Sequence, residues 1–240
     1  MKLQFDSELD FQKDAMAAVV DLFDGQPRGQ PDFSVIRFTE AEGLFSGQEQ
    51  SELGVGNRLL LHEDKLLANA RAVQTRNDIE VADEATPLEA WELFDVPANQ
   101  SRRCPHFSVE METGTGKTYV YLRTIFELSQ RYGLNKFVIV VPSVAIREGV
   151  LKNIEITRDH FRALYNNLPF SPFVYDGRKV SQLRQFAVSH TLQVMVINID
   201  AFRKNFTGSE EERKSNVIYK ESDRLSGRSR SNSRRRRVRL

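Results

Sequence analysis

Residues 109–118 carry the side chains whose types and spacing most clearly indicate chemistry in this chain. They read Val-Glu-Met-Glu-Thr-Gly-Thr-Gly-Lys-Thr. Glycines let backbone N–H groups close around phosphate oxygens, a following lysine can reach the β- and γ-phosphates, and a threonine hydroxyl can bind Mg²⁺. The predicted cofactor-binding residues are Thr113, Gly114, Thr115, Gly116, Lys117 and Thr118. The sequence thus predicts a phosphate-binding loop for ATP and Mg²⁺, with Thr118 as the metal ligand.

The elements on either side of this loop fit the same interpretation. Phe107–Met111 is predicted as a short strand before the loop, and apolar residues at helical spacing predict a helix from Lys117 to about Arg131. Gly133 is expected to end that helix. The alternative is a Gly/Thr-rich turn with an incidental lysine, because Met111 stands where the common pattern has glycine.

Beyond the loop, strands and helices are predicted to alternate. The expected elements are a strand at Lys136–Val141, a helix from Val144 to about Asn153, a strand at Phe173–Tyr175, a helix at Val180–Ser189 and a strand at Gln193–Ile199. Continuous apolar strands of this kind are typical of parallel sheets that are covered on both faces. The predicted fold class is therefore α/β, with a parallel sheet and helices on both faces.

The first hundred residues are less regular. Helices are predicted at Leu9–Phe23 and Leu59–Asn77, and residues 25–58 are predicted to be rich in loops. The expected organisation is an N-terminal helix at 1–24, a loop-rich and helical insertion at 25–105, the main α/β domain at 106–207, an irregular segment at 208–227 and a disordered basic tail at 228–240.

Composition narrows the class of protein. Cys104 is the single cysteine of the 240 residues, which fits a reducing cytoplasm and excludes an internal disulfide. No apolar run is long enough for a membrane helix, and the N-terminus has no signal-peptide core. The formal net charge of +1 hides an asymmetry, because residues 228–240 contain seven arginines and no acid, which leaves 27 basic against 33 acidic residues elsewhere. We therefore expect a cytoplasmic protein with an acidic body and a basic tail.

Three further motifs resemble those of superfamily 2 helicases and translocases, whose phosphate-binding loop also resembles the one described above. Gln12 follows an aromatic residue, as in the motif whose glutamine recognises adenine; the alternative is an exposed glutamine at a helix start. Val140–Gly149 resembles the motif that contacts nucleic-acid phosphates, and Val194–Phe202 resembles a later strand and turn with a backbone contact. The residues implied as DNA-binding are Pro142, Ser143, Arg147 and Asn198. The alternative for Ser143 is a simple N-cap, and Asn198 stands where the helicase consensus prefers Thr or Ser.

Taken together, these motifs and the run from Phe137 to Lys152 resemble the restriction (Res) subunit of type III restriction-modification enzymes over about residues 1–227. The resemblance implies a RecA-like ATP-dependent motor that moves on double-stranded DNA, and a methyltransferase (Mod) subunit as partner. It also implies an acidic pair for ATP hydrolysis on a later strand. No apolar strand followed by Asp-Glu occurs after residue 200. We therefore assign no catalytic residue and expect an N-terminal fragment, incomplete at its carboxyl end, that binds ATP without hydrolysing it.

Two other interpretations stay open at this point. One is a non-catalytic nucleic-acid-binding protein whose Arg/Ser-rich tail binds phosphates with a steep dependence on salt. The other is a different superfamily 2 enzyme, such as a type I restriction motor or a repair helicase. The Val-Pro-Ser-Val-Ala-Ile-Arg run at 141–147 argues against the latter.

We predict that residues from about Arg228 are the product of a shifted reading frame. The resemblance ends there, the composition changes there to arginine and serine, and the chain stops before the expected acidic strand. The alternative is a genuine basic tail that binds nucleic acid. Reading the gene in the other two frames downstream of codon 228 should reveal an apolar strand ending in Asp-Glu, and its absence from both frames would contradict the prediction.

Overall fold

The computed structural model describes residues 4–29, 32–39, 49–80, 88, 90–95, 100–176 and 179–201. Its central element is a three-stranded parallel sheet in the order β5-β7-β6. The strands are β5 (Lys136–Val141), β6 (Phe170–Val174) and β7 (Leu192–Asn198). All three were predicted within a few residues, and the α/β class with a parallel sheet is confirmed.

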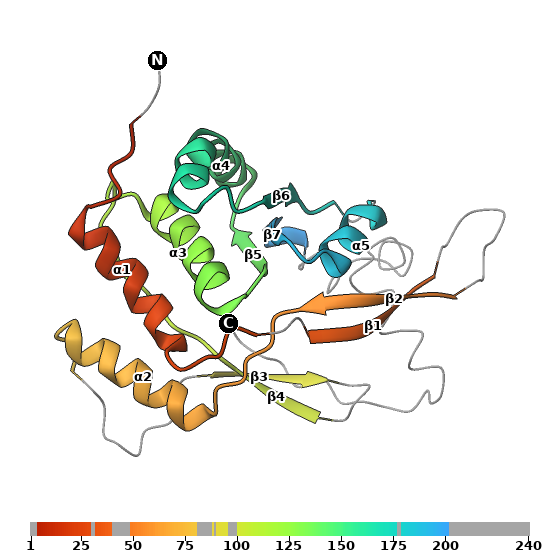
Figure 1. Cartoon of the computed structure of the whole chain (residues 1–240), viewed down its shortest axis with the longest axis horizontal. Helices are drawn as coiled ribbons and strands as arrows, with labels where there is room; N and C mark the ends of the chain where they lie inside the picture. Colours follow the sequence, from red (N-terminus) through yellow and green to blue (C-terminus); the bar gives the residue numbers. More distant parts are fainter. Residues whose placement is uncertain are drawn as a thin grey trace.

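Helices lie on both faces of this sheet (Figure 1). On one face, α3 (Lys117–Tyr132) and α4 (Val144–Leu164) enclose a cluster of buried side chains with alternate residues of β5 and β7. On the other face, α5 (Val180–Val188) packs through Phe186, whose ring lies 5.6 Å from that of Phe173. Side chains alternate along a strand, so successive residues point to opposite faces of the sheet.

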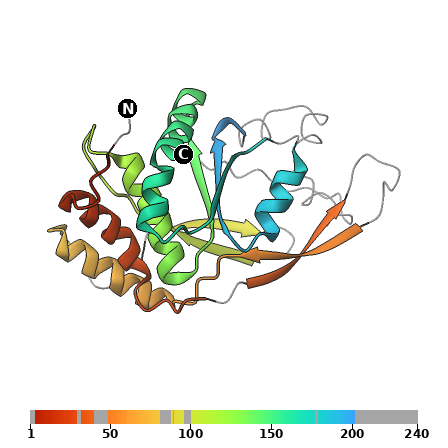
Figure 2. The ribbon, with the colours of Figure 1, turned by 45° about the horizontal axis from the view of Figure 1, so that its top comes forward.

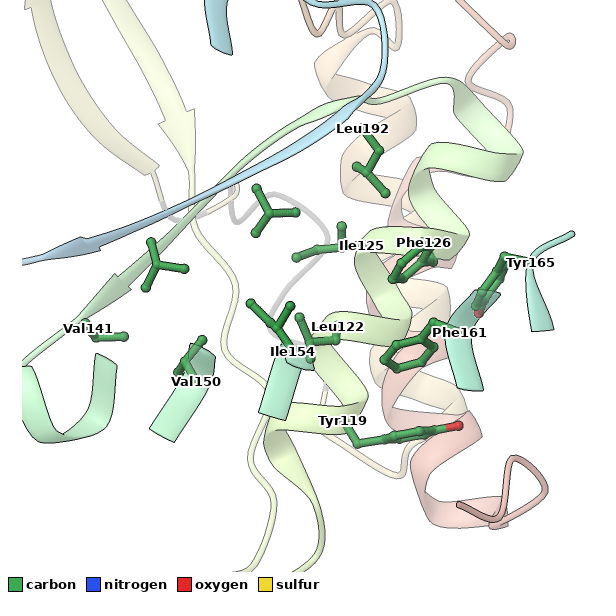
Figure 3. Packing of buried hydrophobic residues seen from close by; sticks show 12 residues of the cluster. Tyr119, Leu122, Ile125, Phe126, Val141, Val150, Ile154, Phe161, Tyr165 and Leu192 are labelled. Carbon is green, nitrogen blue, oxygen red and sulfur yellow. The ribbon is translucent and has the colours of Figure 1, made fainter. Parts of the chain in front are cut away.

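Aromatic rings form much of the core between α3 and α4. Phe161 is 1% exposed, and its ring centroid lies 5.0 Å from that of Phe126 and 5.2 Å from that of Tyr119. Figure 3 places Leu192, from the start of β7, at the opposite end of this cluster from Tyr119. Helix α3 therefore runs antiparallel to the strands, so that its N-terminus lies at the edge where the strands end (Figure 2).

The predicted N-terminal helix packs directly on α3. It is observed as α1 (Asp10–Val20), followed by the short 3₁₀ helix η1 (Asp21–Phe23). Met16 and Val20 are buried in a second cluster with Val120 and Leu128 of α3. A third cluster joins η1 to α2 (Glu63–Arg76), the helix predicted at 59–77. The contact between α1 and α3 brings the start of the chain beside the phosphate-binding loop.

The prediction that residues 25–58 are rich in loops was wrong, and the insertion at 25–105 contains strands that were not predicted. The segment at 25–58, predicted to be rich in loops, contains the antiparallel strands β1 (Asp32–Thr39) and β2 (Glu49–Gly56). The insertion also contains a second antiparallel pair, β3 (Ala90–Asp95) and β4 (Gln100–Pro105). Each strand is held by backbone hydrogen bonds to the next strand along the chain, and the residue pattern within a single short segment does not reveal that partner.

The strand predicted at Phe107–Met111 was also wrong, since residues 106–112 have no regular secondary structure. Their apolar residues suggested a strand, yet within the described residues no strand of the parallel sheet pairs with them. An extended segment becomes a strand only when a neighbour accepts and donates its backbone hydrogen bonds.

Two expectations stay predictions. The boundaries proposed between domains are not tested by this structure. The irregular segment at 208–227 and the basic tail at 228–240 lie outside the described residues. Among the described residues, no helix combines the length and apolar composition that crossing a bilayer requires.

We predict that Phe161→Ala lowers the free energy of unfolding by about 3–5 kcal/mol, because it removes a buried ring from a packed cluster. The control is Ile146→Ala on the same helix, where the side chain is 49% exposed and the cost should be about 0.5 kcal/mol or less. Urea denaturation followed by circular dichroism measures both. Equal costs would contradict the assignment of this cluster as the core.

Candidate nucleotide site

The predicted phosphate-binding loop is a tight turn that leads directly into α3. Gly114 and Gly116 both have φ of +85°, a conformation that is unfavourable for residues with a Cβ. Gly116 is the N-cap of α3. The backbone N–H groups of the first helical turn therefore face a position where an anion is stabilised by the helix dipole.

Two polar side chains of the loop, those of Thr115 and Lys117, converge on one backbone carbonyl. The oxygen of Glu112 accepts a hydrogen bond of 2.7 Å from Thr115 Oγ1 and another of 2.7 Å from Lys117 Nζ. Lys117 is exposed, so its ammonium group can exchange this neutral acceptor for phosphate oxygens, with which charge-assisted bonds are stronger. The loop thus holds Lys117 beside its own glycines.

Gln12 contacts the same loop from α1, 103 residues away in sequence. Its Nε2 donates a 2.9 Å hydrogen bond to the backbone oxygen of Thr115, and its side chain is 7% exposed. A Cβ built on Gly116 would lie 2.7 Å from this Nε2. Sequence reasoning predicted an adenine contact for Gln12 but did not predict its contact with the loop, which depends on how α1 packs on α3.

The residues present fit a nucleotide phosphate and Mg²⁺. A Cβ at Gly114 would meet no atom within 4 Å, so the glycine leaves open space beside the loop. The donors are the Lys117 ammonium group, the Thr118 hydroxyl and the first N–H groups of α3, while Thr113 is an exposed member of the turn. Mg²⁺ usually retains several waters and takes substrate phosphates as ligands, so a single hydroxyl is a plausible protein contribution.

The predicted DNA-binding residues occupy the same edge of the domain. Ser143 follows the end of β5, and Asn198 ends β7 beside it, because Val141 and Asn198 are register partners. The amide N–H of Ile199 donates to Val141 O at 2.9 Å. Since α3 is antiparallel to β5, the loop also lies at this edge, which is where α/β proteins usually bind ligands.

Local contacts engage each of these polar side chains. Ser143 is the N-cap of α4, and its Oγ accepts from the Ile146 N–H at 3.3 Å. Asn198 Oδ1 accepts from the Asp200 N–H at 2.9 Å, and Arg147 donates to Glu148 Oε1 at 2.8 Å. Pro142, before the N-cap, is exposed. The structure therefore brings these residues together and gives each of the three polar side chains a hydrogen-bond partner within its own segment.

Among the described titratable groups whose pKa is shifted, two are a histidine and a lysine near the parallel sheet. Burial lowers the pKa of His160 on α4, and the positive charge of Arg123 lowers it further. Burial lowers the pKa of Lys136 to about 8. Lys136 begins β5, at the end of the strand opposite to Ser143, and its Nζ lies 5.4 Å from the Phe186 ring centroid.

A protein-family model and the curated relatives give the same assignment for this chain. Residues 62–227 match the family described as type III restriction enzyme, res subunit. The chain is 42% identical over 159 residues to the type III restriction-modification enzyme StyLTI Res subunit of Salmonella typhimurium, which covers 58% of this chain and 15% of that protein. It is 32% identical over 177 residues to the EcoPI Res subunit of Escherichia phage P1, covering 73% of this chain and 15% of the relative.

The chain therefore spans only about 15% of the length of these two relatives. The match to the family begins at residue 62, so it includes the loop but not Gln12. No solved structure matches the chain at a significant level.

We predict that Gly116→Ala lowers the free energy of unfolding by about 1 kcal/mol more than Gly114→Ala. Both substitutions place a Cβ at φ of +85°, which costs about 1–2 kcal/mol. Only the Cβ at 116 also displaces the Gln12 amide from Thr115 O, a hydrogen bond worth about 1 kcal/mol. Urea denaturation gives both values, and in a Gln12→Ala background the difference should vanish. A difference that persists there would contradict the contact.

Proposed function

This chain belongs to the type III restriction enzyme Res subunit family, and we propose that its α/β domain is the ATP-binding part of a DNA motor. The observation that carries the proposal is the loop itself, in which two left-handed glycines lead into α3 and hold Lys117 at the helix N-terminus. This arrangement supplies the backbone donors, the positive charge and the helix dipole that a nucleotide phosphate requires.

In the proposed complex, Thr113 to Gly116 surround the phosphates, Lys117 binds the β- and γ-phosphates, and Thr118 is a ligand of Mg²⁺. Gln12 selects adenine. Its Nε2 already donates one hydrogen to Thr115 O, which leaves one N–H and Oε1 as a donor and acceptor pair. Such a pair matches N7 and the N6 amino group of adenine and opposes the O6 of guanine.

The second part of the proposal concerns duplex DNA. The edge formed by Pro142, Ser143, Arg147 and Asn198 lies at the carboxyl ends of β5 and β7, where the N-terminus of α4 can meet a backbone phosphate. The loop and this edge lie at the same end of the sheet. A change in the loop when nucleotide binds would therefore shift the DNA-contacting residues. We therefore assign the DNA contact to this edge.

The function of the whole protein is proposed from its family. The relatives are named as Res subunits of restriction-modification enzymes. By analogy, the full-length protein would hydrolyse ATP, move on DNA and cleave it in the cytoplasm, with a methyltransferase subunit as its partner. The described residues supply the nucleotide-binding part of that activity.

We predict that Lys117→Ala weakens ATP·Mg²⁺ binding by about tenfold or more. The substitution removes a charge-assisted contact of about 1.5–3 kcal/mol. Isothermal titration calorimetry measures the affinity directly. The matched control is Lys152→Ala, which removes an exposed lysine whose Nζ pairs with Glu155 at 2.9 Å on α4 and should leave the affinity unchanged.

Equal affinity of wild type and Lys117→Ala would refute the assignment of the loop. Phosphate release is a separate readout, because it requires carboxylates that we do not assign in this chain. DNA-stimulated release that Lys117→Ala abolishes would uphold the loop but show that the hydrolytic acid lies within these 240 residues.

A further inference from the structure

Arg123 is a buried cation in the second turn of α3. Its side chain is 7% exposed, and its Nη1 donates a 2.5 Å hydrogen bond to the backbone oxygen of Ser7. Within the described part of the chain, no carboxylate lies within salt-bridge distance of Arg123, and its Nε has no hydrogen-bond partner. Its charge acts at longer range on the Glu8 carboxylate and on the hydroxyls of Tyr119 and Tyr165. Because burying a charge without a carboxylate in direct contact is costly, packing alone is a poor explanation for an arginine at this position.

The segment that Arg123 holds also packs on two helices. The Phe5 ring is stacked with that of Tyr119 on α3 at 6.1 Å and lies 5.4 Å from the His160 ring on α4. The Tyr119 hydroxyl and His160 Nε2 are 2.8 Å apart. We call residues 4–9 the N-terminal strap, since they cross α3 and α4 before α1 begins.

The N-terminal strap leads directly into the helical turn that carries Gln12. Helix α1 begins at Asp10, and its N-cap, Leu9, makes no side-chain capping bond. An uncapped first turn frays readily, so its position depends on the residues before it. The N-terminal strap is fixed at Ser7, only five residues before Gln12.

We propose that Arg123 is a positioning residue for adenine recognition: through the Ser7 carbonyl it holds the first turn of α1, and this keeps the Gln12 amide against the loop at Thr115. The inference rests on the proposed function, because it assumes that Gln12 recognises adenine. Arg123 itself does not touch the nucleotide. Its loss should reduce the preference for ATP over GTP, whereas a merely structural arginine would affect both nucleotides equally.

The experiment measures ATP and GTP affinities of the full 240-residue chain by calorimetry for wild type, Gln12→Ala, Arg123→Gln and the double variant. Gln12→Ala should reduce the ratio of ATP to GTP affinity about tenfold, as expected for two lost hydrogen bonds. Arg123→Gln should reduce it about threefold or more. The double variant should match Gln12→Ala, because the two residues act in series.

The matched control is Arg131→Gln, which removes another arginine of α3 that pairs with Glu127 at 3.0 Å and should leave the ratio unchanged. Arg123→Lys should restore part of the preference. If Arg123→Gln does not fold, Phe5→Ala loosens the same strap without disturbing a buried charge, and it should lower the ratio in the same direction.

The outcomes separate the two proposals. Suppose that wild type prefers ATP and Gln12→Ala removes that preference. If the Arg123 and Phe5 variants then keep the preference, or act additively with Gln12→Ala, only this inference is overturned. If wild type binds neither nucleotide, the proposed function fails and the inference fails with it.

Discussion

Helix α3 is buried on two sides, and this burial sets both the position of the phosphate-binding loop and the position of α1. One side packs with α4, β5 and β7 around Phe126 and Phe161, and the other packs on Met16 and Val20 of α1. Because only a short turn separates α3 from β5, the helix must run antiparallel to the strand it covers. Its N-terminus therefore lies where the strands end, and the loop that precedes it lies at the same edge as Ser143 and Asn198.

The same packing gives α1 its place in the site. Apolar contacts fix the distance between α1 and α3, and polar contacts then fix the orientation of the first turn of α1. Gln12 bonds to Thr115 O, and Arg123 bonds to Ser7 O. Each hydrogen bond alone contributes about 1 kcal/mol or somewhat more. Their main effect is to restrict orientation. A glutamine amide with one N–H engaged can present its remaining donor and acceptor in only a few orientations.

Several predictions held because their physical cause is local. The helix at Lys117–Tyr132 ends at Gly133, whose φ of +71° is the left-handed conformation that often terminates helices. The strand at Lys136–Val141 was predicted with the observed bounds, because Pro142 limits it and its apolar run has no helical spacing. By contrast, α4 was predicted to end near Asn153 and continues to Leu164, since Ile154 and Phe161 pack into the core.

The amino-acid sequence by itself determined the phosphate-binding loop, the helix after it and the alternation of strands and helices. Glycines, proline and apolar spacing act on the backbone within a few residues, so their effect can be read from neighbouring positions. Only the tertiary structure decided that residues 107–111 are not a strand, that 32–39 pair with 49–56, that Gln12 contacts the loop from α1 and that Arg123 contacts Ser7 from α3. Strand pairing depends on hydrogen bonds to a second segment, which the residues of one segment do not reveal. The contacts of Gln12 and Arg123 join residues 103 and 116 positions apart, which meet only when the hydrophobic core forms.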